Sequence, residues 1–160
     1  MTHSASVQDC LEAVYRFLSY RPRSEGEIKQ WLQRRGCGGD VAEAVVARLR
    51  EQGLSDDLAF ARFWKDNRLS FRPRSSRLIR KELREKRVAV DIIEEVTGDI
   101  DDDQIAYKLG SGRMSSLAGL DYAQFRRRLA SYLTYRGFSY EVVRRTVNLL
   151  WQERTSSSDD

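Results

Sequence analysis

The chain has 160 residues, of which 28 are Lys or Arg and 24 are Asp or Glu. This length fits one compact domain or a few small units in tandem, and the many Leu, Glu, Arg and Gln residues favour helices. There is no apolar run near the roughly 20 residues that cross a bilayer, and no basic start followed by an apolar segment. We therefore expect no membrane contact, no secretory signal and a cytoplasmic location.

The two cysteines, Cys10 and Cys37, have neither CxxC spacing nor a histidine nearby. Cysteines without such a pattern are typical of proteins in a reducing compartment, where thiols stay unpaired. We expect two free thiols that are buried or partly buried.

The first third of the chain predicts three helices in succession. The first covers 9–20 and ends near Pro22, because the residue before a proline avoids helical geometry. Ser24 and Glu27 form a Ser-x-x-Glu capping box that starts the second helix, and Gly36 supplies the left-handed turn that ends it. A third helix follows, and the residues expected to cap and close it are Asp40 and Gly53.

The tetrapeptide Arg-Pro-Arg-Ser occurs at 21–24 and again, 51 residues later, at 72–75. At this spacing apolar residues also match in register: Ile28 with Ile79, Leu32 with Leu83, Val41 with Ile92, and Val45 with Val96. A third copy without the tetrapeptide follows at a spacing of 50, with Leu129, Leu133 and Val142 in the matching positions. Matches of this kind indicate internal repeats of about 50 residues.

The repeats predict an all-α fold of three tandem three-helix units. The later helices are expected near 56–70, 75–86 and 91–97, and near 102–109, 121–136 and 139–152. Arg87 stands where the other copies have Gly36 and Gly137, so we expect its corner to turn differently. The predicted segments are a flexible N-terminus at 1–8, units at 9–53, 54–98 and 99–152, and a disordered tail at 153–160.

Residue patterns that support catalysis are missing. His3 is the only histidine, and there is neither a Walker loop nor a GxGxxG motif after a strand, so we expect no enzyme and no cofactor. The acidic cluster Asp99–Asp103 has the spacing that opens a calcium loop, but Gln104 stands where such a loop needs glycine. We expect no metal site, and a helix-capping role for Asp102 or Asp103.

Basic residues gather in the middle of the chain, where residues 62–87 contain eleven Lys or Arg and three Asp or Glu, ahead of an acidic block at 91–103. On a helix from 75 to 87, four of these cations fall within about 100° of arc, next to a helix start that favours anions. Arginine also suits bidentate contacts to phosphate or carboxylate. The candidate partner-binding residues are Arg21, Arg23, Arg72, Arg74, Arg77, Arg80, Lys81, Arg84, Arg126, Arg127, Arg144 and Arg145.

Most aromatic residues fall at core-like helical spacing, so packing is their expected role. The predicted exposed exceptions are Tyr20, Phe71 and Tyr135.

Four stretches in order along the chain resemble the RecX family of bacterial regulatory proteins: RPRSEGEIKQWLQRRG, LREQGLSDDLAFARFWKDNR, RPRSSRLIRKELREK and RRRLASYLTYRGFSYEVVRRTV. The likeness covers roughly residues 9–151 and is most specific between Leu54 and Arg68. It implies an elongated, curved array of three three-helix repeats that lies in the groove of the RecA–DNA filament. It further implies a protein without catalytic residues that suppresses the ATP hydrolysis, strand exchange and coprotease activities of RecA in DNA repair and the SOS response.

Two functions remain open. One is a monomeric inhibitor whose main partner is the RecA filament, with weaker, salt-sensitive contacts to single- and double-stranded DNA. The other is a helix-turn-helix-type protein that acts directly on DNA, because trihelical units with a basic second or third helix are typical of that class. Sequence-selective binding to naked DNA separates the two.

Overall fold

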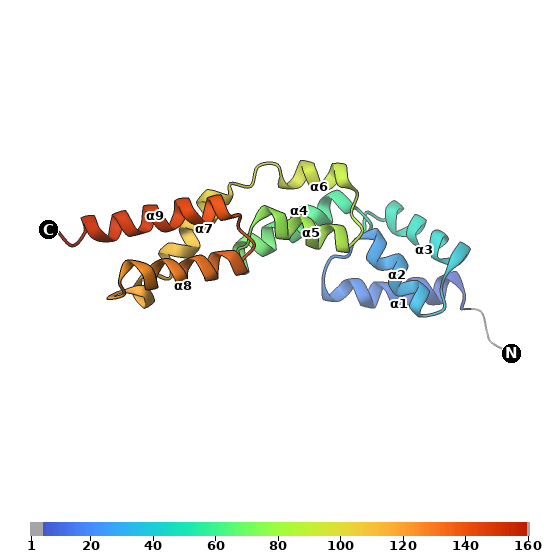
Figure 1. Ribbon diagram of the computed structural model, residues 1–160. Helices are drawn as coiled ribbons and strands as arrows, with labels where there is room; N and C mark the ends of the chain where they lie inside the picture. The colour runs from blue at the N-terminus through green and yellow to red at the C-terminus, as the bar shows by residue number, and fades with distance from the viewer. Residues whose placement is uncertain (1–4, 160) are drawn as a thin grey trace. The chain divides into compact units, whose positions relative to one another are not determined.

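The computed structural model describes residues 5–159, and within them the chain is entirely helical, with no strand (Figure 1). His3, the only histidine, lies outside the described residues. The elements are α1 (Val7–Tyr20), α2 (Glu25–Arg34), α3 (Gly39–Glu51), α4 (Asp57–Phe71), α5 (Ser76–Glu85), α6 (Val90–Thr97), α7 (Asp102–Ser111), the 3₁₀ helix η1 (Met114–Leu117), α8 (Tyr122–Tyr135) and α9 (Tyr140–Ser156). The predicted all-α fold of three three-helix units is confirmed.

The contacts within the chain divide it into two compact units. Unit one contains the residues up to 66 together with 82–96, and unit two contains 67–81 together with 97 onward. Within unit one, α1, α2 and α3 pack around a core that includes Val14, Leu32 and Leu49. Within unit two, α9 packs against α7 and α8 around Phe125 and Leu150. The middle repeat is therefore shared between the two units.

The reason for this sharing is that the second helix of one repeat begins against the following repeat. In unit one, Ser24 Oγ donates a hydrogen bond to the Lys86 carbonyl (2.6 Å), and the Glu25 amide donates to Asp57 (2.8 Å). Asp57 accepts this bond while half-buried, and burial raises the pKa of its carboxyl. The start of α2 is therefore fastened to the second repeat.

The same junction recurs in unit two. The Ser75 amide donates to the Arg136 carbonyl (3.0 Å), and the Ser76 amide donates to Asp102 (2.8 Å). Each junction also contains one glycine at a point of close approach: a Cβ at Gly26 would lie 2.5 Å from Cβ of Arg87, and a Cβ at Gly137 would lie 2.3 Å from Cγ of Leu78. Repeats two and three thus supply equivalent docking corners.

The corner at Arg87 corrects one prediction. Arg87 has φ 62°, in the same left-handed region as Gly36 and Gly137 at the equivalent positions, so this corner turns as the others do. Left-handed geometry costs a non-glycine residue roughly 1–2 kcal/mol. The contacts that Ser24 and Gly26 make with this corner hold it in place.

The helix ends also differ from the predictions. Ser6 forms a capping box with Asp9, so α1 begins at Val7 and takes in the last two residues of the predicted flexible segment 1–8, of which residues 1–4 lie outside the described part. The N-cap of α3 is Gly38 without a side-chain bond, so Asp40 does not cap it, and Asp101, rather than Asp102 or Asp103, caps α7.

At the other end, α9 continues to Ser156, into the predicted disordered tail 153–160. The last turns of α9 are held by side chains that pack back onto unit two. Arg154 donates a hydrogen bond to the Leu117 carbonyl (3.3 Å), and Glu153 accepts a hydrogen bond from Tyr107 on α7 (2.9 Å).

Cys10 and Cys37 form a disulfide, so the prediction of two free thiols is wrong, whereas the predicted burial is confirmed at exposures of 1% and 6%. Both side chains lie in the core of the first repeat, where α1 meets the corner that follows α2. Packing of these two elements brings together cysteines that are 27 residues apart in the sequence.

Candidate anion-binding site

The first Arg-Pro-Arg-Ser corner, residues 21–24, directs its arginines into internal contacts. Arg21 makes a bidentate pair with Glu27, at 2.6 and 3.2 Å. The Arg23 guanidinium lies 3.9 Å above the ring of Phe17, which is a cation–π contact. The two arginine side chains are only 28% and 15% exposed. The first corner therefore presents little free cationic surface.

Glu27 balances the positive charge of this corner. Lys86 adds a third cation 3.6 Å from its carboxylate and lies 4.4 Å from the centroid of the Trp64 ring. Burial raises the pKa of the Glu27 carboxyl, but hydrogen bonds from Arg21 and the Ser24 amide, with the charges of Arg21 and Lys86, outweigh burial and hold the pKa below its ordinary value. Glu27 is therefore a stable anion at the centre of the cluster.

The second corner, residues 72–75, contains the same tetrapeptide but lacks this carboxylate. Leu78 stands at the position of Glu27, and the corner borders a cavity of about 480 Å³. The lining residues include no acid: they are Arg72, Arg74, Leu78, Tyr135 and Arg136. We call this cavity the arginine pocket. Three guanidinium groups around one opening favour an anionic occupant.

Backbone carbonyls hold the arginine pocket in shape. Arg136 donates to the Pro73 carbonyl (3.0 Å), and Arg74 Nε donates to the Arg72 carbonyl (3.0 Å). Tyr135, at the mouth of the pocket, is 84% exposed, as Tyr20 and Phe71 also are at 84% and 78%, which confirms the predicted exposed aromatics. An exposed ring beside arginines suits stacking on a nucleobase or packing on a partner side chain.

The start of α5, which adjoins the arginine pocket, is already hydrogen-bonded. Ser75 Oγ accepts from the Leu78 amide (3.2 Å), and Asp102 accepts from both the amide and the hydroxyl of Ser76. An anion in the pocket would therefore meet guanidinium groups rather than these two backbone amides.

The predicted basic face of α5 is partly used within the fold. Arg77 donates to the Gly137 carbonyl (3.4 Å), and Arg80 donates to Thr97 Oγ1 (2.9 Å), both within unit two. Lys81 is exposed there, and Arg84 is exposed in the part of α5 that belongs to unit one. Two of the four residues of this face therefore bond to other parts of unit two, and the other two have exposed side chains.

The four candidates in the third repeat also differ among themselves. Arg126 and Arg127 on α8 and Arg144 on α9 are exposed, and within residues 5–159 none of the three is in an ion pair. Arg145 makes a two-point contact with Asp103 (3.0 and 3.2 Å), which raises the pKa of the guanidinium. Asp103 thus serves as a salt-bridge partner.

Sequence reasoning did not select Arg136, which lies in the arginine pocket beside the predicted exposed Tyr135. The signal was present, because Arg136-Gly137 matches the Arg35-Gly36 corner of the first repeat. Within residues 5–159, no group of three or more His, Cys, Asp or Glu side chains is placed to hold a metal ion. No helix of the described chain is long and apolar enough to cross a membrane.

Family models match all three repeats. The first, second and third three-helix domains of RecX match residues 10–49, 56–96 and 101–147. The chain belongs to the RecX family. This is a family of regulatory proteins and not a known enzyme family, so the chain is a regulatory protein built from helical repeats.

Relatives named regulatory protein RecX match over nearly the whole length. The protein of Prosthecochloris aestuarii is 32% identical over 146 residues, which cover 91% of this chain and 96% of the relative. That of Streptomyces coelicolor is 30% identical over 156 residues, with 96% and 83% covered. The crystal structure of RecX from Lactobacillus salivarius has the same fold, with a TM-score of 0.76 at 18% identity over 90% of this chain and 96% of that chain.

Proposed function

We propose that this RecX protein binds the RecA–single-stranded-DNA filament and inhibits the recombinase, ATPase and coprotease activities of RecA in DNA repair and the SOS response. The observation that carries the proposal beyond family membership is the arginine pocket. Its lining brings together Arg72, Arg74 and Arg136 and includes no acidic residue, and the exposed Tyr135 lies beside them. A filament that contains nucleic acid offers such a pocket phosphate groups.

The set of residues that we propose for the filament contact is smaller than the set predicted from the sequence. Arg72 and Arg74 form the centre, with exposed Lys81 on α5 and with Arg126 and Arg127 on α8. We expect Arg21 and Arg23 to contribute less to filament binding, because their guanidinium groups already contact Glu27, Phe17 and Trp64. We also expect a smaller contribution from Arg145, because it is paired with Asp103.

We expect the protein to act as a monomer in the cytoplasm, where RecA works, and to bind single- and double-stranded DNA by itself only weakly and with a steep salt dependence. A helix-turn-helix reader would instead hold particular sequences tightly without RecA. Nanomolar, sequence-selective binding to naked duplex DNA at physiological salt would exclude the filament as main partner.

The deciding experiment measures RecA ATPase on single-stranded DNA while the protein is titrated in below stoichiometry. We expect the wild type to inhibit, and Arg72→Gln with Arg74→Gln to inhibit much less at the same thermal stability. The matched control, Arg16→Gln with Arg34→Gln, removes two exposed charges from α1 and α2 and should inhibit as the wild type does. No inhibition by the wild type at any ratio would refute the proposed function.

A further inference from the structure

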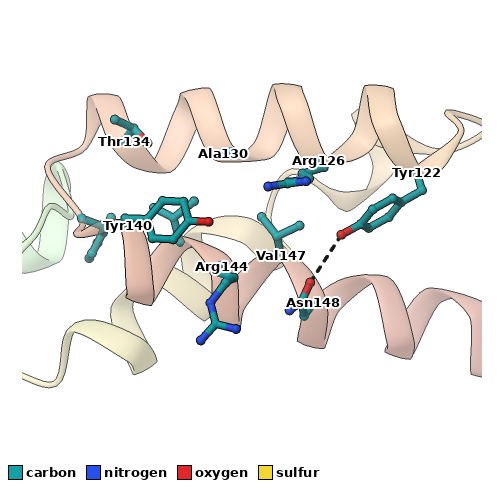
Figure 2. A pocket seen from close by; sticks show the side chains of 10 residues that line it. Tyr122, Arg126, Ala130, Thr134, Tyr140, Arg144, Val147 and Asn148 are labelled. Carbon is teal, nitrogen blue, oxygen red and sulfur yellow. Dashed lines mark hydrogen bonds between the residues drawn. The ribbon is translucent and has the colours of Figure 1, made fainter.

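A second cavity lies between α8 and α9, entirely within unit two. It has a volume of about 410 Å³, and Figure 2 shows Tyr122 and Tyr140 at its two ends with Arg126 projecting between them. Its floor is apolar and buried, with Phe138, Val143 and Val147 exposed by 3%, 5% and 2%. We call this cavity the α8–α9 groove.

In the first repeat a side chain occupies the equivalent place. The left-handed glycines Gly36 and Gly137 align the second helices of the two repeats. In this register Arg126, Ala130 and Arg144 of the third repeat match Glu25, Lys29 and Glu43 of the first. In the first repeat, Lys29 lies 3.2 Å from both Glu25 and Glu43 and so joins α2 to α3. The hydrogen bonds to the two glutamates raise the pKa of Lys29.

The third repeat has the opposite charges and lacks the central side chain. Arg126 and Arg144 replace the two glutamates, and within residues 5–159 neither makes an ion pair. Ala130 replaces the lysine and is too short to cross between the helices, so the position is hollow. The group that would complete this arrangement, as Lys29 completes the first, is a carboxylate.

We infer that the α8–α9 groove binds an acidic amphipathic segment of a protein partner. Its carboxylates would face Arg126 and Arg144, and an apolar side chain would lie on the floor formed by Val143 and Val147. The inference rests on the proposed function in one respect, because it assigns this segment to the protein component of the filament.

The lining favours a protein segment over nucleic acid. Four residues of the groove, Tyr122, Arg126, Ala130 and Thr134, follow one another at intervals of four along α8, a span of about 18 Å. This exceeds the roughly 10 Å from i to i+7 over which a docked amphipathic helix places its apolar anchors, so the groove is long enough for such a helix. An aliphatic floor also suits an apolar side chain better than the polar edges of a base, which lose hydrogen bonds to water when buried.

Photocrosslinking tests the occupant directly. Tyr140, 72% exposed at one end of the groove, is replaced by p-benzoylphenylalanine, and the protein is irradiated with a filament of purified RecA on single-stranded DNA, with ATPase inhibition measured in the same samples. We expect a crosslink to one RecA peptide that contains several Asp or Glu and an apolar stripe. The same label at Tyr20, which lies in unit one outside the groove, should not reach that peptide.

Charge variants test the chemistry. Arg126→Gln with Arg144→Gln should lower the crosslink yield at subsaturating protein by roughly tenfold, the factor expected when a charge-assisted contact is lost. Arg128→Gln, on a different cavity of α8, is the control and should leave the yield unchanged. In Ala130→Glu the new carboxylate should occupy the groove, as the Lys29 side chain occupies the equivalent place in the first repeat, and the crosslink should be lost. The control is Ala130→Ser, whose side chain is too short to fill the groove, and it should keep the crosslink.

The outcomes separate this inference from the proposed function. Inhibition of RecA by the wild type together with a crosslink from position 140 to DNA, to a peptide without acidic residues, or to nothing would overturn the inference and leave the proposed function standing. Loss of yield in Arg128→Gln as large as in the double variant would also overturn it. Absence of inhibition by the wild type would instead refute the proposed function.

Discussion

The two Arg-Pro-Arg-Ser corners contain the same four residues and are used differently. At the first, Glu27 pairs with Arg21, and the ring of Phe17 supports Arg23. At the second, Leu78 stands in the place of Glu27, and the arginines border a cavity. The tetrapeptide therefore determines where one helix ends and the next begins. A residue that lies outside the tetrapeptide, Glu27 in the first repeat and Leu78 in the second, determines whether a carboxylate stands beside these cations at that position.

The two junctions below these corners differ as well. In unit one the small residue, Gly26, lies on the helix that docks, and the receiving corner carries Arg87. In unit two the helix carries Leu78 and the receiving corner carries Gly137. Each junction therefore has one glycine at the point of close approach, but the glycine lies on the docking helix in unit one and on the receiving corner in unit two.

The largest effect on stability is expected from Gly137→Ala. A Cβ there would lie 2.3 Å from Leu78 Cγ and 2.5 Å from Ser75 Oγ, in backbone with φ +91°. Crowding adds to the left-handed strain, so the free energy of unfolding should fall by about 3 kcal/mol. Gly36→Ala is the control, because φ is +78° but no atom lies within 4 Å, and it should cost only about 1 kcal/mol. Equal losses in urea denaturation would show that the second junction is not closely packed.

The next largest effect on stability is expected from Glu27→Leu, which gives the first corner the leucine that the second corner has at this position. Glu27→Leu leaves Arg21, Arg23 and Lys86 without their shared anion and removes half of a capping box, so it should cost about 2 kcal/mol by urea denaturation. The reverse change, Leu78→Glu, should cost less than about 1 kcal/mol, because Leu78 is only partly buried, yet it should fill the arginine pocket with a carboxylate and weaken filament binding. Unchanged filament binding by Leu78→Glu would contradict the claim that a carboxylate at this position keeps the arginines from binding a partner.

A smaller effect depends on pH. Because the pKa of Glu27 is lower in the folded chain than in the unfolded one, the stabilisation is complete above the ordinary glutamate pKa of about 4.3 and is lost as the pH falls through the folded-state value. The wild type should therefore exceed Glu27→Gln in unfolding free energy near neutral pH, and the difference should shrink below about pH 4. Contributions from Glu25 and Asp57, whose pKa values are also shifted, occur in both proteins and cancel. A difference that is constant with pH would contradict the assigned ion pairs.

Local signals in the sequence were sufficient for the fold. Apolar periodicity, the Ser24–Glu27 capping box and the corner glycines lie within one or two turns of the helices they define, so three repeats were predictable. Arg87 shows the limit, because tertiary contacts hold it in a conformation that its own propensity disfavours. The disulfide shows the same limit, since only the packing of the first repeat brings Cys10 to Cys37.

The candidate site was predictable in part. The repeat register placed Leu78 opposite Glu27, so the loss of the anion at the second corner was visible in the sequence. The pairing of Arg145 with Asp103 and the gathering of Arg136 with Arg72 join residues 42 and more positions apart, and the sequence contains no local signal for such pairs. Charge density alone therefore does not show which arginines have partners within the fold.

The smallest effect on stability, and the sharpest test of the comparison, is expected from the arginines themselves. Arg72→Gln with Arg74→Gln should change the unfolding free energy by less than about 1 kcal/mol, because Arg72 is exposed and polar contacts of arginines near the surface contribute little to stability. Arg21→Gln with Arg23→Gln should cost more, because it breaks the cluster around Glu27.

Binding to oligothymidylate, measured as a function of salt, should show the opposite order, with the larger effect from the variant at 72 and 74. The pair at 72 and 74 should reduce the slope of log affinity against log salt by about 0.7 for each lost phosphate contact, and the pair at 21 and 23 should leave it unchanged. Equal slopes for the two variants would mean that the two corners do not differ in function, whatever their contacts within the fold.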